Sequence, residues 1–284
     1  TDETYIFSIC KLQNDYVKFS EFLKQNLENN EWHISYNGLA FDAQITHNII
    51  KDHENLMLMD GESIAEEIYG YAQEAIKRSN NREFQTFAEW HMTIKQIDVF
   101  KLNHWDNMAK LSSLKWIQYS MDWDNIIDMP IEHTTNIDKQ DQLDLIIKYC
   151  INDVESTKEI FERSKPLIAL RKDLTNQYDI SLYNASEPRI SKELFAYYLS
   201  KELGIPKYDL KKLRTFRNVI KIKDLILDYI NFESVEFNNL VDKFKTVEIN
   251  PNQTKGGFKY SVNYKGVKTH FGLGGAHGAN KPGV

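Results

Sequence analysis

The chain has 284 residues, of which 42% are hydrophobic, enough to bury the core of one large domain or of a domain with an appendage. It has no run near the roughly 18 apolar residues of a membrane span, and its first residues lack a secretory signal pattern. We therefore expect a soluble, cytoplasmic, globular protein with no membrane partner. Cys10 and Cys150 are too few for a disulfide scaffold or a zinc site, and we expect core thiols.

Charge is distributed unevenly along the chain, whose formal net charge is −6. Residues 1 to 200 hold 20 Lys and Arg against 33 Asp and Glu, and residues 201 to 284 hold 15 against 8. The acidic part is compatible with a carboxylate metal site, but charge alone favours solvated acidic faces. In the basic part, Arg214, Arg217, Lys221 and Lys223 either face nucleic-acid phosphates or form a solvated helix face.

The hydrophobic pattern of the first half predicts alternating strands and helices. We expect strands at 4–10, 31–36 and 94–100, an insertion at 52–93, and helices at about Asp15–Leu27, Glu62–Arg78 and Asp141–Arg163, with one or two more within Leu102–Tyr119. A further helix starts near Asp42, after the Asn37-Gly38 turn. This order indicates an α/β fold.

The second half has a different pattern. After Pro166 it is mainly helical to about Lys243, and Gly256 to His277 predicts a β-hairpin with a Lys265-Gly266 turn. The hairpin runs into the glycine-rich stretch FGLGGAHG, which is either a flexible turn or a close backbone approach. We expect a domain boundary between residues 165 and 190.

Two segments carry candidate chemistry. Asn37, Phe41 and Asp42 place an amide, an aromatic ring and a carboxylate around a turn at a strand end. Asp42 is as well suited to helix N-capping as to metal binding. Tyr149 and Asp153 are four residues apart in a predicted helix, so both project from one face, although such a pair also occurs on ordinary amphipathic helices. Asp98 could be a further carboxylate of the same site. An Asp at the end of a strand more often has a structural role.

Together these segments resemble a known family. Asn-x-x-x-Phe-Asp, followed about 110 residues later by Tyr-x-x-x-Asp, is similar to the second and third exonuclease motifs of the DEDD nuclease superfamily, tyrosine subclass. Ser113 and Leu114 begin a stretch similar to the Ser/Thr-Leu-x-x-hydrophobic motif of family B exonucleases. Four longer stretches also resemble sequences of phage-type family B DNA polymerases: SLKWIQYSM, YCINDVESTKEIF, LYNASEPRISKELF and HFGLGGAHGANKPGV.

The resemblance implies a proofreading 3′→5′ exonuclease with a ribonuclease H-like (DnaQ-like) fold, a mixed sheet flanked by helices, in residues 1–165. Residues 166–284 would form a helical linker and the start of the polymerase domain. It further implies two Mg²⁺ or Mn²⁺ ions held by Asp42 and Asp153, with Tyr149 orienting the attacking water. Asn37, Phe41, Ser113 and Leu114 would contact the single-stranded 3′ end. Primer-template DNA and the rest of a polymerase chain would be the other partners, in a bacterial host if the protein is phage-encoded.

One departure from the family pattern changes the expected activity. The first motif, Asp-x-Glu on the leading strand, is not found, and Asp2-Glu3 cannot replace it because adjacent strand residues point to opposite faces. We expect the motif upstream of this chain, which alone should bind metal weakly and hydrolyse DNA poorly. Two alternatives stay open: a DEDD-type RNA exonuclease, and a non-catalytic fragment that binds single-stranded DNA.

Overall fold

The computed structural model describes residues 3–107, 111–251, 259–272 and 275–279. It is a mixed α/β protein with small sheets. Contacts divide it into two compact units, Thr1–Tyr198 and Leu199–Val284. None of the helices in the described ranges combines the length and apolar character that crossing a bilayer requires.

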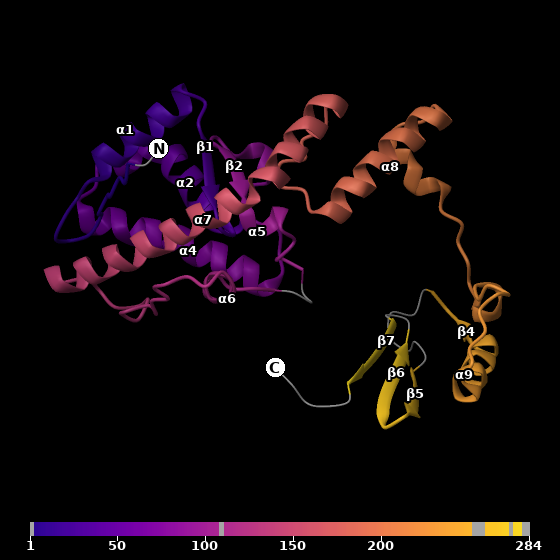
Figure 1. Cartoon of the computed structure of the whole chain (residues 1–284). Helices are drawn as coiled ribbons and strands as arrows, with labels where there is room; N and C mark the ends of the chain where they lie inside the picture. Colours follow the sequence, from indigo (N-terminus) through magenta and orange to yellow (C-terminus); the bar gives the residue numbers. More distant parts are fainter. Residues whose placement is uncertain (1–2, 108–110, 252–258, 273–274, 280–284) are drawn as a thin grey trace. The chain divides into compact units, whose positions relative to one another are not determined.

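The first unit holds two parallel strands and most of the helices (Figure 1). The strands are β1 (Trp32–Ser35) and β2 (Lys95–Asp98), paired from Trp32 with Lys95 to Ser35 with Asp98. The helices are α1 (Tyr16–Glu28), α2 (Asp42–Lys51), α3 (His53–Leu56), α4 (Gly61–Asn81), α5 (Val99–Leu102), α6 (Leu114–Ser120), α7 (Gln140–Tyr178) and α8 (Glu187–Leu203), the last of which ends in the second unit.

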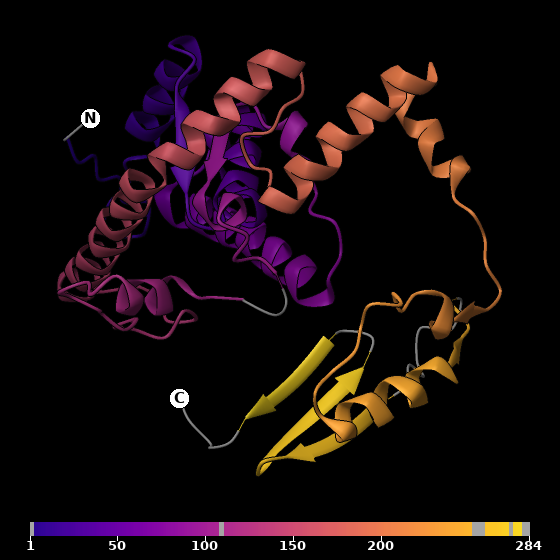
Figure 2. The same ribbon diagram turned by 45° about the vertical axis from the view of Figure 1, so that its right-hand side comes forward.

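Besides a small cluster around Leu182, Ala185 and Ile190, two larger hydrophobic clusters hold the first unit together. One is built mainly from helices α1 to α4, around Tyr16, Leu23, Ile49 and Ile64. The other joins β2 to α5, α6 and α7 through Ile97, Val99, Leu102, Ile117 and Ile160. Helix α7 contacts β1, α5 and α6, and Figure 2 shows it passing in front of the two strands. The second cluster thus places α6 and α7 beside the strand ends.

The strand expected at residues 4–10 is not present. Residues 3–8 form no regular secondary structure, and only Ile9 makes an isolated bridge, with Asn14. The rings of Tyr5 and Phe7 pack instead on Phe22 of α1, with centroids 5.2 and 5.4 Å apart. Alternating apolar residues can be buried against a helix as well as in a sheet, and the local pattern does not distinguish the two cases.

One helix prediction holds in part and another needs correction. Of the one or two helices expected within Leu102–Tyr119, α6 is present, but the helical conformation ends after α5, where His104 has a left-handed φ of 59°, and resumes only at Leu114. Helix α7 does not end near Arg163 but continues through Pro166 to Tyr178, for 39 residues in all. A proline usually interrupts a helix, but tertiary packing around Arg171 retains this one. Position 165, the expected domain limit, therefore lies within a continuous helix.

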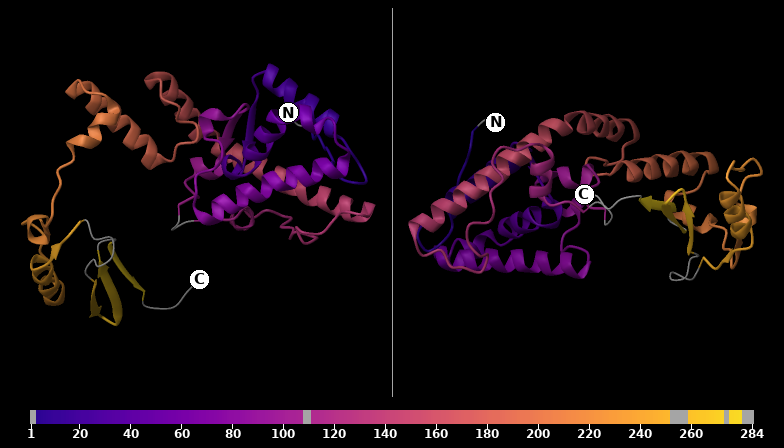
Figure 3. Two further views of the ribbon diagram at one scale, coloured as in Figure 1. Left: turned by 180° about the vertical axis from the view of Figure 1, so that it is seen from behind. Right: turned by 60° about the horizontal axis from the view of Figure 1, so that its bottom comes forward.

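The second unit contains α9 (Val235–Lys245) and the strands β3 (Ile220–Lys221), β4 (Glu248–Ile249), β5 (Lys259–Tyr264), β6 (Val267–Gly272) and β7 (Gly275–Ala279). The predicted hairpin is confirmed: β5 and β6 are antiparallel, and Lys265 and Gly266 both have positive φ, as its tight turn requires. Strand β7, beside β6 in Figure 3, was not predicted. It begins at Gly275, and residues 273–274 of the glycine-rich stretch lie outside the described residues.

Candidate functional site

The corner after β1 is fixed by one buried carboxylate. Asp98, at the end of β2, is fully buried, and its two oxygens accept the backbone N–H groups of Asn37 at 2.9 Å and Leu39 at 3.1 Å. Asn37 has a left-handed φ of 62°, a conformation that asparagine tolerates better than most residues. The Asn37-Gly38 turn is thus held from the neighbouring strand, 59 to 61 residues away.

Asp98 has a structural role in this arrangement. It also accepts the N–H of Phe100 and so caps α5, while its own N–H donates to Asn184 Oδ1. Burial raises the pKa of Asp98 to about 6, against the opposing effect of the N–H donors. The carboxylate itself accepts only backbone N–H groups, so it serves the fold.

Asp42 is the first residue of α2, directly after Phe41. The residue is exposed, yet protein surrounds its carboxyl closely enough for desolvation to raise its pKa. Phe41 is half-buried and precedes the helix with a φ of −140°. The N-cap position is Phe41 and no side-chain cap hydrogen bond is made, so Asp42 is not the N-cap that the sequence allowed. As an acidic residue in the first turn it stabilises the helix dipole.

Gly38 brings the end of β1 close to Asp42. A Cβ atom at Gly38 would lie 1.8 Å from Ser35 Oγ and 3.5 Å from Asp42 Oδ2. The buried Ser35 hydroxyl has no hydrogen-bond partner in the described part of the chain. The absence of a side chain at Gly38 is therefore what allows the Ser35 hydroxyl and the Asp42 carboxylate to lie over the same turn.

On α7, Tyr149 and Asp153 interact with each other as their spacing predicts. Desolvation is the main cause that raises the pKa of Tyr149 to about 12, and a hydrogen bond and the negative charge of Asp153 add to it. The phenol is thus protonated at neutral pH. Lys115 lies over the Tyr149 ring, 5.8 Å from its centroid, and forms an ion pair with Asp128 at 2.6 Å.

A buried glutamine on α6 holds the Asp153 carboxylate. Gln118 is fully buried, and its Nε2 donates to Asp153 Oδ1 at 3.1 Å and to Ser156 Oγ at 2.7 Å. Ser156 in turn donates its hydroxyl to the Asp153 carbonyl, so its oxygen must accept from Gln118. This order of donors and acceptors assigns the amide orientation, with nitrogen toward Asp153.

Ser113 and Leu114 begin helix α6. Ser113 is exposed and caps the helix, since its Oγ accepts the Trp116 N–H at 3.2 Å, while its own hydroxyl hydrogen is not used by that bond. Leu114 packs on the second hydrophobic cluster. Just before them, the carbonyl of Ser112 accepts a hydrogen bond from the Tyr36 hydroxyl at 2.7 Å, which joins α6 to the end of β1.

These contacts connect the three candidate segments, though not completely. Tyr36, directly before the corner at 37–42, donates to Ser112, directly before α6, and α6 is linked to Asp153 through Gln118. Within the described residues, Asp42 forms no hydrogen bond or ion pair with Tyr149 or Asp153. In the same residues no three His, Cys, Asp or Glu side chains are grouped so that they could hold a metal ion. Asp2 lies outside the described residues, and Glu3 accepts a hydrogen bond from Tyr5.

Two residues of this site were not predicted. Lys115 follows the Ser113-Leu114 pair, a proximity that could have drawn attention to it. Gln118 is four residues after Leu114, but nothing local indicates that it contacts a carboxylate 35 residues away.

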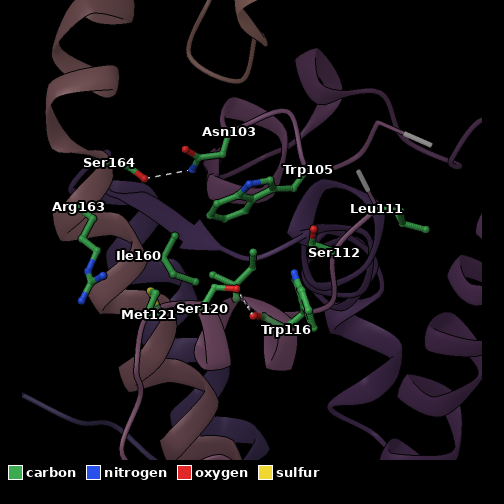
Figure 4. Close-up of a pocket in the computed structure, with 11 residues that line it drawn as sticks. Asn103, Trp105, Leu111, Ser112, Trp116, Ser120, Met121, Ile160, Arg163 and Ser164 are labelled. Atoms are coloured by element: carbon green, nitrogen blue, oxygen red, sulfur yellow. Dashed lines mark hydrogen bonds between the residues drawn. The ribbon is translucent and has the colours of Figure 1, made fainter. Parts of the chain in front are cut away.

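A cavity of about 740 Å³ lies on the side of α6 that faces Trp105 (Figure 4). Its walls include Trp105, Trp116, Ile160 and the Asn103–Ser164 hydrogen bond of 3.1 Å. Tyr149, Asp153 and Asp42 do not line it. The candidate carboxylates are therefore not at this cavity.

Comparison with known proteins adds no relative: no protein-family model, curated protein or solved structure matches the chain.

Proposed function

We propose that this chain is the proofreading 3′→5′ exonuclease region of a phage-type family B DNA polymerase, with a ribonuclease H-like fold in its first unit. In this role it removes the 3′-terminal nucleotide of single-stranded DNA during replication. The proposal rests on the sequence motifs, and the parallel β1–β2 pair with flanking helices is compatible with it.

One observation supports the proposal most strongly. Segments that resemble three separate exonuclease motifs are joined by two hydrogen bonds, Tyr36 to Ser112 and Gln118 to Asp153, across 76 and 35 residues. A chance likeness of short motifs gives no reason for them to be connected in the fold.

The residues of the chain take the following roles in the proposal. Tyr149, protonated at neutral pH because its pKa is about 12, orients water by its hydroxyl while Asp153 accepts. Phe41 stacks on the terminal base, a contact that tolerates any base. Asn37, Ser113 and Leu114 hold the strand, Ser113 through the hydroxyl hydrogen that its capping bond leaves available.

The described residues do not fit the metal requirement of the proposed reaction by themselves. Mg²⁺ or Mn²⁺ would need several carboxylates, and the described residues bring together too few to hold an ion without further ligands. This observation favours one alternative for the chain by itself, namely that it binds single-stranded DNA without cutting it.

The decisive experiment measures nucleotide release from labelled single-stranded DNA and from RNA of the same sequence, with Mg²⁺ or Mn²⁺. The chain and a version preceded by a strand with Asp-x-Glu are each compared with Asp153→Ala, Tyr149→Phe and, as a control on the same helix, Asp173→Ala, which removes an exposed carboxylate. We expect the extended version to degrade DNA from the 3′ end. Asp153→Ala should abolish this degradation, whereas Asp173→Ala should not.

The other outcomes separate the alternatives. Binding without degradation by either version supports the non-catalytic alternative, and a preference for RNA supports the RNA exonuclease. Full activity in Asp153→Ala would show that the site is elsewhere.

A further inference from the structure

A segment of the second unit combines positive charge with exposed aromatic rings. Residues 207–219, KYDLKKLRTFRNV, are called here the basic segment. They contain five Lys or Arg residues and one acidic residue, Asp209, which pairs with Lys212. Lys211, Arg214 and Arg217 form no ion pair with any residue in the described ranges. Three cations of the segment are thus available to an external anion.

The basic segment also exposes apolar side chains that the unit does not cover. Every residue from 211 to 219 is exposed. Phe216 is 88% exposed, Tyr208 74% and Leu213 57%. Isolated exposed apolar residues are common, but several of them in one short segment usually mark a binding surface.

Backbone geometry places part of the segment in a column. Residues Lys207–Leu213 form a 3-10 helix, in which side chains three apart lie directly above one another. Tyr208 and Lys211 therefore share one edge, and Arg214, three residues further, follows at its end. An aromatic ring and two cations along one edge match a ligand that alternates planar rings with negative charges.

We propose that the basic segment binds single-stranded nucleic acid, with Lys211, Arg214 and Arg217 on phosphates and Tyr208 and Phe216 stacked on bases. Only unpaired bases present their faces to aromatic side chains, which favours a single strand over a duplex. A net charge of −6 also disfavours a chain that coats duplex DNA through bulk charge. The basic segment belongs to the second unit and the residues of the proposed exonuclease site to the first, and binding by the basic segment involves no hydrolysis.

The test is a binding titration of the whole chain against fluorescein-labelled oligothymidylate in EDTA, by fluorescence anisotropy at several KCl concentrations. The triple variant K211A/R214A/R217A removes the three proposed phosphate contacts. Its matched control is K259A/K265A/K268A, which removes three exposed lysines of the β5–β6 hairpin in the same unit. Phe216→Ala tests stacking, and circular dichroism checks that each variant is folded.

We expect the triple variant to bind about tenfold more weakly and to lower the slope of log affinity against log salt by about 2, since each phosphate contact on a single strand contributes about 0.7. Phe216→Ala should weaken binding about tenfold and leave the slope unchanged. The control triple should change affinity less than the first triple does.

Three results would overturn the proposal. They are no binding by the unmodified chain, an equal loss in both triple variants, and equal affinity for duplex and single strand. No binding would leave a protein surface as the alternative partner of the basic segment. The titration in EDTA measures binding without hydrolysis, so loss of the exonuclease proposal would leave this one intact.

Discussion

The side-chain nitrogen of Gln118 lies 3.1 Å from Asp153 Oδ1 and links helix α6 to helix α7. The contact is fully buried at Gln118 and uses both of its amide hydrogens, the second toward Ser156. It therefore fixes one oxygen of the Asp153 carboxylate.

Gln118→Leu tests this relationship in the extended version of the chain, under the exonuclease proposal. Because the Asp153 carboxylate loses its fixed orientation, we expect kcat for degradation of single-stranded DNA to fall by about tenfold or more while KM changes little. Gln96→Leu is the control, since Gln96 is also a buried amide and does not contact Asp153. Equal kcat losses in the two variants would show that Gln118 acts only through stability.

The buried carboxylate of Asp98 predicts a pH dependence of stability. Its folded pKa of about 6 is above the value of about 3.9 in an unfolded chain, so the folded state binds the proton more tightly. Stability should therefore fall as pH rises from about 4 to about 6, by up to about 3 kcal/mol, and this contribution should be constant above that range.

Urea unfolding of the chain and of Asp98→Asn at pH 4, 5, 6 and 7 measures this effect. The free energy of unfolding of the unmodified chain minus that of Asp98→Asn should decrease across this range, because asparagine does not titrate. If the difference grows with pH instead, the three backbone N–H bonds outweigh desolvation and lower the pKa.

Gly38→Ala should destabilise the first unit by about 1 to 3 kcal/mol, because its Cβ would lie 1.8 Å from Ser35 Oγ and 2.5 Å from Ser35 Cβ. Ser35→Gly removes both atoms, so the double variant should recover much of the loss. Thermal unfolding of the two single variants and the double variant measures the coupling. Gly70→Ala, in the open interior of α4, should instead stabilise by about 0.5 to 1 kcal/mol.

Arg171 is fully buried and donates to the carbonyl oxygens of Ala185, Leu167 and Leu102. Arg171→Leu should cost about 3 kcal/mol or more in urea unfolding, because it leaves buried carbonyl groups without donors. Arg163→Leu, on the exposed part of the same helix where Arg163 pairs with Glu159, should cost under about 1 kcal/mol. Equal stability of Arg171→Leu and the unmodified chain would mean that the cost of burying the guanidinium cancels its three hydrogen bonds.

Local patterns in the sequence were sufficient for several elements. Helical spacing of apolar residues predicted α1, and the Lys265-Gly266 pair predicted a hairpin turn that needs positive φ. The four-residue spacing of Tyr149 and Asp153 likewise predicted their contact on one helix. Each of these depends on interactions within a few residues, which is why one sequence was enough.

Long-range packing decided the rest. Whether residues 4–10 pair as a strand depends on what lies beside them, and here the rings of Tyr5 and Phe7 pack on Phe22 of helix α1. Whether Asp98 is a ligand or a structural anchor depends on backbone N–H groups some 60 residues away, and the partner of Asp153 comes from another helix. The sequence by itself thus determined which residues could carry chemistry, and only the tertiary structure decided which of them meet, because burial and hydrogen bonding between distant segments are properties of the folded chain.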